Sequence, residues 1–125
     1  MKTTSDAGFL HQELTELIIR AAFTVHNALG YGFAEKIHEN ALFVELKRNH
    51  LDVKQQTPLT VTYAGVVVGD YVTDLVVNDV VLVEVKAVRQ LLNYLRGTKC
   101  EVGLLLNFGG RVEVKRMVFG NQYKK

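Results

Sequence analysis

A chain of 125 residues, of which 48% are hydrophobic and 22% charged, has the length and composition of one compact globular domain. Its one cysteine, Cys100, excludes an internal disulfide, and a net charge of +2 permits a nucleic-acid partner without requiring one. The apolar runs are too short for a transmembrane helix, and the first residues lack the apolar core of a secretory signal. We therefore expect a soluble cytoplasmic protein without a membrane partner, folded as one domain over residues 1–125 with flexible tails at 1–8 and 120–125.

Two helices are expected in the first half of the chain. Apolar residues recur at spacings of three and four from Leu14 to Leu29, which predicts one amphipathic helix. Glycines 30 and 32 should end it, since glycine readily adopts the left-handed conformation common at helix ends. A second helix is predicted over about 33–49, with Ile37, Ala41 and Val44 facing the core.

The residues from 52 to 86 are rich in valine, threonine and tyrosine, which favours strands. We expect strands near 52–56, 58–63, 66–69, 71–77 and 80–86, with turns at 64–65 and 78–79. The strands at 71–77 and 80–86 have apolar residues at both odd and even positions, and so on both faces, which is typical of strands covered by helices on both sides. A short helix over about 88–96 and strands at 101–107 and 111–118 complete a predicted α/β domain.

Charged residues at the end of an apolar strand are the first candidates for a site. Glu84 and Lys86 are two residues apart, so both side chains would point to one face of the strand, and Asp74 precedes them on the neighbouring strand. Two carboxylates can hold Mg²⁺ through oxygen ligands, and a lysine can orient a water molecule for attack on a phosphodiester. Taken alone, these residues are explained more simply by a surface ion pair between Glu84 and Lys86.

The proposed pairing of Asp74 with Glu84 depends on the connection between their strands. A strict two-residue turn at 78–79 would place Asp74 opposite Val83 and direct it away from Glu84. A three-residue loop or a bulge would bring both carboxylates to the same face. We predict such an irregularity, without which the site would not form.

Two further segments carry polar side chains at helical spacing. Glu35 and His38 would share one helix face, either supporting a metal or forming an ordinary helix start. Gln90 and Tyr94 would share another, either binding a phosphate or base or packing in the fold. The basic residues near the C-terminus allow contact with a phosphate backbone, although they are also typical of a solvated surface.

Taken together, these segments resemble the GxxExxY family, a prokaryotic branch of the PD-(D/E)XK nuclease-like superfamily. The resemblance extends over about residues 13–119, in the family's order: 25–30, the Gly32-x-x-Glu35-x-x-His38 motif, 83–88, 90–95 and 103–109. Two features depart from the family pattern. His38 replaces the motif's tyrosine, and only three residues separate Lys86 from Gln90.

The resemblance implies a restriction-endonuclease-like core, with a mixed central sheet flanked by helices. It also implies a nuclease triad of Asp74, Glu84 and Lys86, with Glu35 as a further metal carboxylate and Mg²⁺ or Mn²⁺ as the cofactor. Gln90 and Tyr94 match the Gln-x-x-x-Tyr motif of RecB-type exonucleases and, with His38, are expected to bind substrate. The expected function is hydrolysis of nucleic acid, DNA in the first instance. The alternative is an inactive nucleic-acid- or protein-binding module, and a homodimer is compatible with either function.

Overall fold

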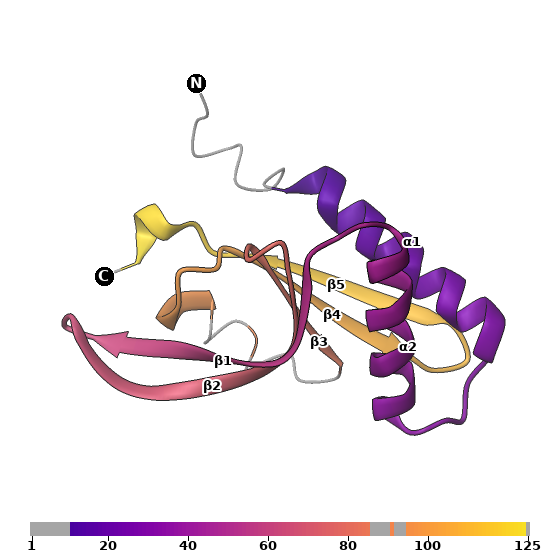
Figure 1. Cartoon of the computed structure of the whole chain (residues 1–125). Helices are drawn as coiled ribbons and strands as arrows, with labels where there is room; N and C mark the ends of the chain where they lie inside the picture. The colour runs from indigo at the N-terminus through magenta and orange to yellow at the C-terminus, as the bar shows by residue number, and fades with distance from the viewer. Residues whose placement is uncertain (1–10, 86–90, 92–94, 125) are drawn as a thin grey trace.

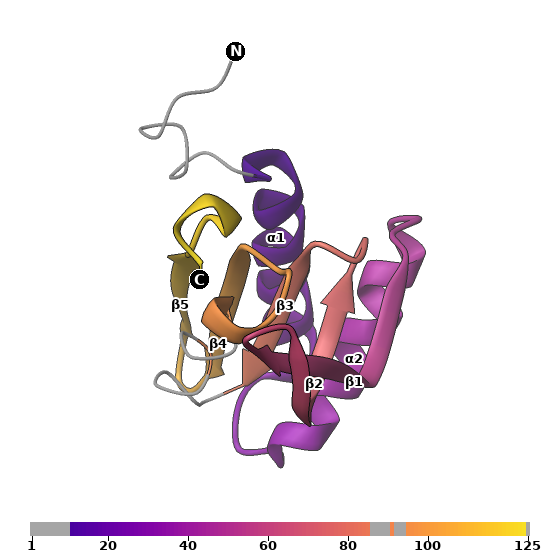
Figure 2. The ribbon, with the colours of Figure 1, turned by 90° about the vertical axis from the view of Figure 1, so that its left-hand side faces the viewer.

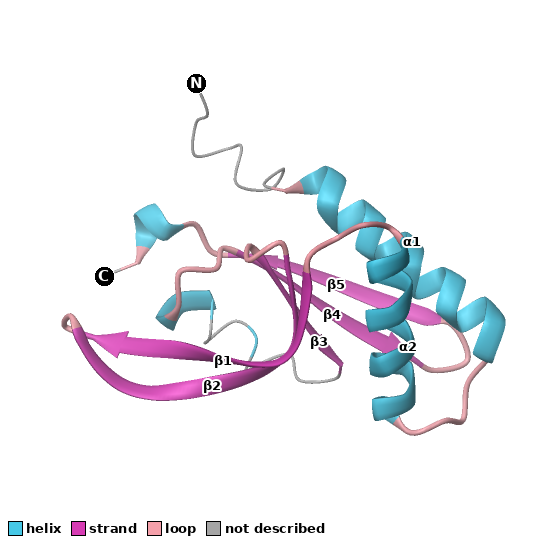
Figure 3. Ribbon diagram, in the orientation of Figure 1, coloured by secondary structure: helices cyan, strands magenta, loops and turns pink. Residues whose placement is uncertain are grey.

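The computed structural model describes residues 11–85, 91 and 95–124, arranged as two helices followed by a five-stranded sheet (Figure 1, Figure 3). The elements are α1 (Gln12–Leu29), α2 (Glu35–Arg48), β1 (Val53–Tyr63), β2 (Val66–Val77), β3 (Val81–Val85), β4 (Val102–Phe108), β5 (Val112–Val118) and the short 3-10 helix η2 (Asn121–Tyr123). Leu91 and residues 95–97 are also helical, within the span predicted for the third helix. No helix of the described part of the chain is both long and apolar enough to cross a membrane.

The sheet is mixed, with the strand order β1-β2-β3-β4-β5. Only β3 and β4 are parallel, while the other neighbouring pairs are antiparallel. A parallel pair needs a crossover connection, and the helical residues 91 and 95–97 lie within it. Two pairs of predicted strands are in fact continuous: 52–56 and 58–63 correspond to β1, and 66–69 and 71–77 correspond to β2.

Both faces of the sheet are covered, as the apolar character of the central strands predicted. Helices α1 and α2 pack on one face through residues such as Ile18, Leu42 and Leu46. Leu91 and Leu95 pack on the other face. Figure 1 and Figure 2 show residues 95–97, drawn in orange, on the side of the sheet away from α1 and α2. Because the two clusters hold β3 and β4 from both sides, the strand that carries Glu84 lies in the interior of the domain.

The orientation of α2 differs from the prediction. Ile37 and Val44, expected in the core, are 44% and 56% exposed, whereas His38, Glu39, Leu42 and Leu46 are buried. Apolar residues occur around much of this helix, so their spacing does not select one face. Tertiary contacts select it instead: the His38 ring stacks on Phe108 with 4.7 Å between ring centroids, and its Nε2 lies 2.9 Å from the carbonyl oxygen of Gly30. This rotation turns Glu39 toward the sheet.

Strands β1 and β2 extend beyond the rest of the sheet as a hairpin arm, residues 57–73. Within the described residues, β2 pairs with β3 only over Leu75–Val77, whereas it pairs with β1 along nearly its whole length. Figure 1 shows the arm projecting from the body of the domain. Its tip is the predicted turn, where Ala64 and Gly65 have φ values of 51° and 77°.

The C-terminal residues 121–124 contact the segment that precedes β4. The backbone N–H of Asn121 donates to the Glu101 carboxylate at 2.7 Å. Lys124 Nζ donates to the carbonyl oxygens of Thr98 and Cys100, also at 2.7 Å each. These hydrogen bonds join η2 and Lys124 to the residues that precede β4.

Candidate functional site

The connection between β2 and β3 contains three residues, as the candidate site required. Val77 pairs with Val81 and Leu75 with Val83, so residues 78–80 form the loop. Asn78 and Asp79 both adopt left-handed backbone conformations, with φ values of 51° and 59°. Continuing this register by one residue places Asp74 opposite Glu84, and the predicted irregularity is confirmed.

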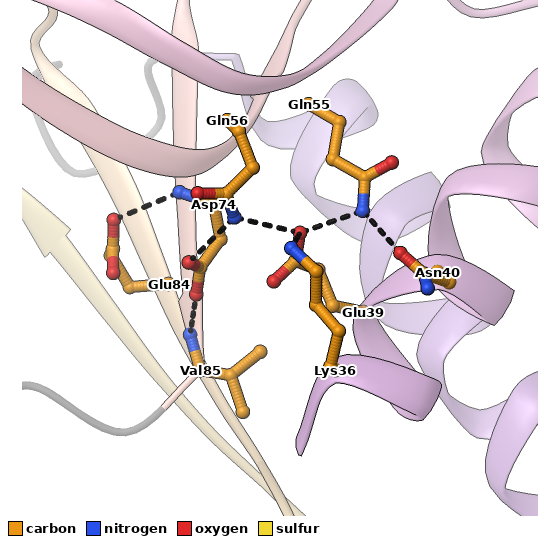
Figure 4. Close-up of polar contacts among 8 residues, drawn as sticks. All are labelled: Lys36, Glu39, Asn40, Gln55, Gln56, Asp74, Glu84 and Val85. Carbon is orange, nitrogen blue, oxygen red and sulfur yellow. Dashed lines mark hydrogen bonds and ion pairs between the residues drawn. The ribbon is translucent and has the colours of Figure 1, made fainter. Parts of the chain in front are cut away.

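The carboxylates of Asp74 and Glu84 bridge the two strands where the regular β2–β3 pairing ends. The backbone N–H of Asp74 donates to Glu84 Oε1 at 3.2 Å. In return, the backbone N–H of Val85 donates to Asp74 Oδ2 at 3.0 Å. Figure 4 shows both contacts. Side-chain oxygens thus accept from backbone donors here, and the two acidic groups are held beside each other by opposite strands.

Glu84 is nearly buried, with 6% of its surface exposed. Its Oε1 also accepts hydrogen bonds from the hydroxyls of Tyr71 and Thr73, the latter at 2.8 Å. Burial raises the pKa of Glu84, the two hydroxyls oppose that rise, and the negative charge of Asp74 adds to it. The other oxygen, Oε2, accepts no hydrogen bond from the described residues. Glu84 therefore has one anchored oxygen and one available to a further ligand.

Asp74 is partly buried, and its pKa is also raised, chiefly by desolvation. The nearby negative charge of Glu39 contributes to the rise, whereas the hydrogen bonds from Val85 and Gln56 and the charge of Lys36 oppose it. Gln56 Nε2 lies 3.4 Å from Asp74 Oδ1. Both carboxyl groups therefore have raised pKa values. A cation bound next to them would favour the ionised state of each carboxyl group.

Glu39 is the carboxylate that α2 brings to this region. It is 4% exposed, and its Oε2 accepts from Lys36 Nζ at 3.1 Å, Gln55 Nε2 at 2.7 Å and Gln56 Nε2 at 2.9 Å. Figure 4 shows Gln56 between Glu39 and Asp74. Glu39 and both glutamines were not predicted from the sequence. Glu39 follows Glu35 by four residues on the same helix, but without the orientation of α2 that spacing carried no information about its neighbours.

Gln56 has an unusual backbone conformation for a residue inside a strand. Its φ is 50°, and it is omitted from the regular pairing, although Gln55 pairs with Leu75 and Thr57 with Thr73. Gln56 thus lies opposite Asp74 on the neighbouring strand. A left-handed conformation of a residue other than glycine costs about 1–2 kcal/mol. Such strain is common at functional sites, and here it accompanies a side chain that contacts both Glu39 and Asp74.

The remaining predicted site residues are two on α2 and three outside the described residues. Glu35 is the exposed first residue of α2, and the α2 charges that act on Asp74 are those of Glu39 and Lys36. His38 does not fit its predicted substrate-binding role, because its ring is 1% exposed and packed on Phe108 in the core. The other three predicted residues lie outside the described residues: Lys86, Gln90 and Tyr94.

The chemistry of the carboxylate pair fits a small divalent cation. Among the described residues, no group of three or more histidine, cysteine, aspartate or glutamate side chains forms a metal site. Mg²⁺ does not need such a cage, since it is commonly held by one or two carboxylates and completes its shell with water and substrate phosphate. Asp74 and Glu84 supply two carboxylates, and Glu84 Oε2 has no competing partner among the described residues.

Comparison with known proteins gives a family-level match. The family model described as the PD-(D/E)XK nuclease superfamily matches residues 12–117. This match and the mixed sheet covered by helices confirm the predicted fold class. An alkaline exonuclease (LHK-Exo) from Laribacter hongkongensis is similar in structure, with a TM-score of 0.44 and 12% identity, covering 82% of this chain and 69% of that one. No curated protein matches the sequence significantly.

Proposed function

Because the chain belongs to the PD-(D/E)XK nuclease superfamily, we propose that it is a metal-dependent nuclease that hydrolyses phosphodiester bonds of nucleic acid, with DNA as the first substrate to test. The observation that carries the proposal is the three-residue β2–β3 loop, because its register sets Asp74 beside Glu84. Two raised carboxyl pKa values and an available oxygen on Glu84 support a cation site between them.

In this proposal Asp74 and Glu84 hold Mg²⁺ or Mn²⁺. When bound, such an ion polarises the phosphate and lowers the pKa of a water molecule. The hydroxyls of Tyr71 and Thr73 fix one oxygen of Glu84 and so orient the other. Lys86 is assigned the positioning of the attacking water, because it follows Glu84 by two residues in the sequence.

We assign the supporting role on α2 to Glu39, in place of Glu35. The Gln56 amide contacts both Glu39 and Asp74, so it couples the helix carboxylate to the proposed metal ligand. Glu39 acts through this contact as a positioning residue. Lys36 partly offsets the added negative charge, since its ammonium group lies 3.1 Å from Glu39 Oε2.

The finer family assignment also belongs to the proposal. We place the chain in the GxxExxY branch on the order of its sequence segments, with His38 in the position of the motif tyrosine. Gln90 and Tyr94 retain their sequence-based assignment to the substrate groove. A homodimer is a further part of the proposal, and light scattering that detects only monomer at working concentration would exclude it.

The second candidate is an inactive nucleic-acid- or protein-binding module with the same fold. Two features of the sequence favour it: only three residues separate Lys86 from Gln90, and His38 stands where the family motif has a tyrosine. This module would bind its partner without turnover. It would also show no Mn²⁺ affinity that depends on Glu84.

The test is calorimetric Mn²⁺ titration of the wild type, Asp74→Asn and Glu84→Gln, with cleavage assays on plasmid and single-stranded DNA. Asp79→Asn is the matched control, because Asp79 is an exposed acid in the same hairpin and asparagine tolerates its left-handed backbone. We expect both site variants to lose metal binding and cleavage and the control to keep both. Cleavage that survives in both site variants would refute the assignment, and a folded wild type without metal binding or cleavage would favour the binding module.

A further inference from the structure

A second polar feature lies away from the carboxylate pair, between the hairpin arm and the C-terminal segment. It is a groove of about 630 Å³. β1 forms one wall, and residues 96–99 with 121 and 124 form the other. Figure 1 and Figure 2 show these segments side by side, with the helical residues 95–97 between the arm and η2. Its polar lining residues include Thr60, Thr62, Arg96, Lys99, Asn121 and Lys124.

The lining of this groove is basic. Among the described residues, the lining includes Arg96, Lys99 and Lys124 and no acidic side chain. Arg96 and Lys99 are exposed, and the Arg96 guanidinium lies 5.4 Å from the centre of the Phe119 ring. Lys124 is held in place by two carbonyl oxygens. The charges are thus attached to defined segments on one wall of the groove.

The opposite wall adds neutral polar groups from β1. Thr60 and Thr62 line the groove from β1, and the whole segment 55–69 contains no charged residue. Two acids lie close to the lining residues: Asp70 is the β2 residue paired with Thr60, and Glu101 Oε2 accepts the backbone N–H of Asn121. Hydroxyl and amide donors interleaved with lysine and arginine are the usual partners of phosphate oxygens. This combination favours a phosphodiester backbone over an acidic peptide.

The groove is connected to the candidate nuclease site by β1 itself. Thr60 and Thr62 follow Gln56 by four and six residues, and a strand rises about 3.3 Å per residue, which gives separations of roughly 13 and 20 Å. Phosphates along one strand of a duplex are spaced by about 3.4 Å along the helix axis. The groove would therefore meet phosphates about four to six nucleotides from the carboxylates.

We propose that this groove binds the phosphate backbone of the nucleic-acid substrate at a distance from the cut, through Arg96, Lys99 and Lys124. The inference rests on the proposed nuclease function for the identity of its ligand. It assigns to the groove the affinity for long substrates, while the chemistry remains with Asp74 and Glu84. Substrates that end before the groove should not depend on these three cations.

The experiment compares Arg96→Glu/Lys99→Glu with the control Arg111→Glu/Lys115→Glu, which makes the same charge change at exposed residues outside the groove lining. Binding of a labelled 20-mer, single-stranded and duplex, is measured by fluorescence anisotropy in EDTA over a range of salt concentrations. Each lost phosphate contact should lower the salt slope by about one. We expect the groove variant to bind at least tenfold more weakly, with a slope lower by about two. The control should change less than twofold.

Cleavage kinetics add a second readout. The groove variant should raise KM for the 20-mer and leave cleavage of a four-nucleotide substrate unchanged, and Arg96→Lys/Lys99→Arg should restore binding. Equal losses in the groove variant and the control would overturn the proposal, because charge alone would then explain them. Competition by an acidic peptide as strong as that by nucleic acid would also overturn it, in favour of a peptide site.

Failure of the groove and failure of the nuclease function are distinguishable. A wild type that binds the 20-mer through Arg96 and Lys99 but does not cut it with Mn²⁺ supports the groove and refutes the nuclease. A wild type that cuts DNA, with a groove variant that binds as tightly, refutes the groove alone. Glu84→Gln should lose cleavage and keep the 20-mer affinity measured in EDTA.

Discussion

The hydrogen bond from Tyr71 to Glu84 offers a sensitive test of the candidate site. Tyr71→Phe removes the hydroxyl and keeps the ring, which is buried. Glu84 Oε1 would retain Thr73 Oγ1 and the backbone N–H of Asp74 as donors. Since the Tyr71 hydrogen bond opposes the rise of the Glu84 pKa, the variant should have a still higher Glu84 pKa than the wild type.

The size of the effect follows from the charge of the acceptor. A hydrogen bond to a charged group contributes about 1.5–3 kcal/mol, against about 0.5–1.5 kcal/mol for one between neutral groups. Tyr71→Phe should therefore destabilise the wild type at pH 8 by about 1–1.5 kcal/mol more than it destabilises Glu84→Gln. For a domain of this size, that difference corresponds to roughly 3–8 °C in Tm. The difference should shrink at low pH, because Glu84 is then protonated and, like the glutamine of Glu84→Gln, offers Tyr71 a neutral acceptor.

The assay is a double-mutant cycle of Tyr71→Phe and Glu84→Gln by urea unfolding at pH 8 and pH 5. The cycle isolates the Tyr71–Glu84 pair from any other contact of the tyrosine hydroxyl. Mn²⁺ titrations of the wild type and Tyr71→Phe at the same pH values measure the affinity of the metal site. Because the ionised carboxylate is the metal ligand, Tyr71→Phe should weaken Mn²⁺ binding more at pH 5 than at pH 8.

Two results would refute this reasoning. A coupling energy near zero at pH 8 would mean that Tyr71 does not stabilise the ionised form of Glu84. An unchanged pH dependence of Mn²⁺ binding would mean that the protonation of Glu84 does not control the metal site. The first result would remove the hydrogen-bond argument, and the second would remove Glu84 as a metal ligand.

Three other predictions concern the strained glutamine, the orientation of α2 and the buried charge. Gln56→Gly should keep the left-handed backbone but weaken Mn²⁺ binding several-fold in calorimetry, because it removes the amide beside Asp74. An unchanged Mn²⁺ affinity would exclude a positioning role for Gln56. Leu42→Ala should cost about 2–5 kcal/mol in urea unfolding and Val44→Ala less than about 1 kcal/mol, and the reverse order would contradict the rotation of α2. Glu84 has a raised pKa in the folded state, so the folded state binds more protons than the unfolded state between the two pKa values, and stability should fall as pH rises through that window. In metal-free buffer, Glu84→Gln should make the free energy of unfolding fall less steeply with pH. The raised Glu84 pKa would be contradicted if the stability of the wild type rose from pH 4 to pH 7 and Glu84→Gln abolished that rise.

Much of the fold was predictable from local patterns. The amphipathic stripe from Leu14 to Leu29, the glycine that ends it and the turn at Ala64-Gly65 are short-range features, and all three occur in the structure. Apolar residues at both odd and even positions of β3 predicted that both faces of this strand are covered. A strand exposed on one side would instead alternate apolar and polar residues. The need for a three-residue loop or a bulge before β3 also followed from the sequence, given the assumption that Asp74 and Glu84 meet.

The surroundings of the two carboxylates were not predictable, because they depend on long-range contacts. The face that α2 buries was decided by the His38 ring on Phe108, and this contact brought Glu39 rather than Glu35 toward β1. The left-handed conformation of Gln56 has no local sequence signal, since glutamine is not a turn residue. The groove joins β1 to residues 96–99 and 124, which are distant in the chain.

The sequence by itself identified the candidate residues for the proposed chemistry, an acid on β2 and an acid on β3, and the condition under which they meet. That condition followed from the side-chain period of two along a strand, which is a local property, whereas the register itself came from the structure. The tertiary structure decided what surrounds the acids: the hydroxyl of Tyr71 on Glu84, the amide of Gln56 on Asp74 and the burial that raises both pKa values. Desolvation and side-chain contacts arise only when separate elements pack together, so no pattern along the chain encodes them directly.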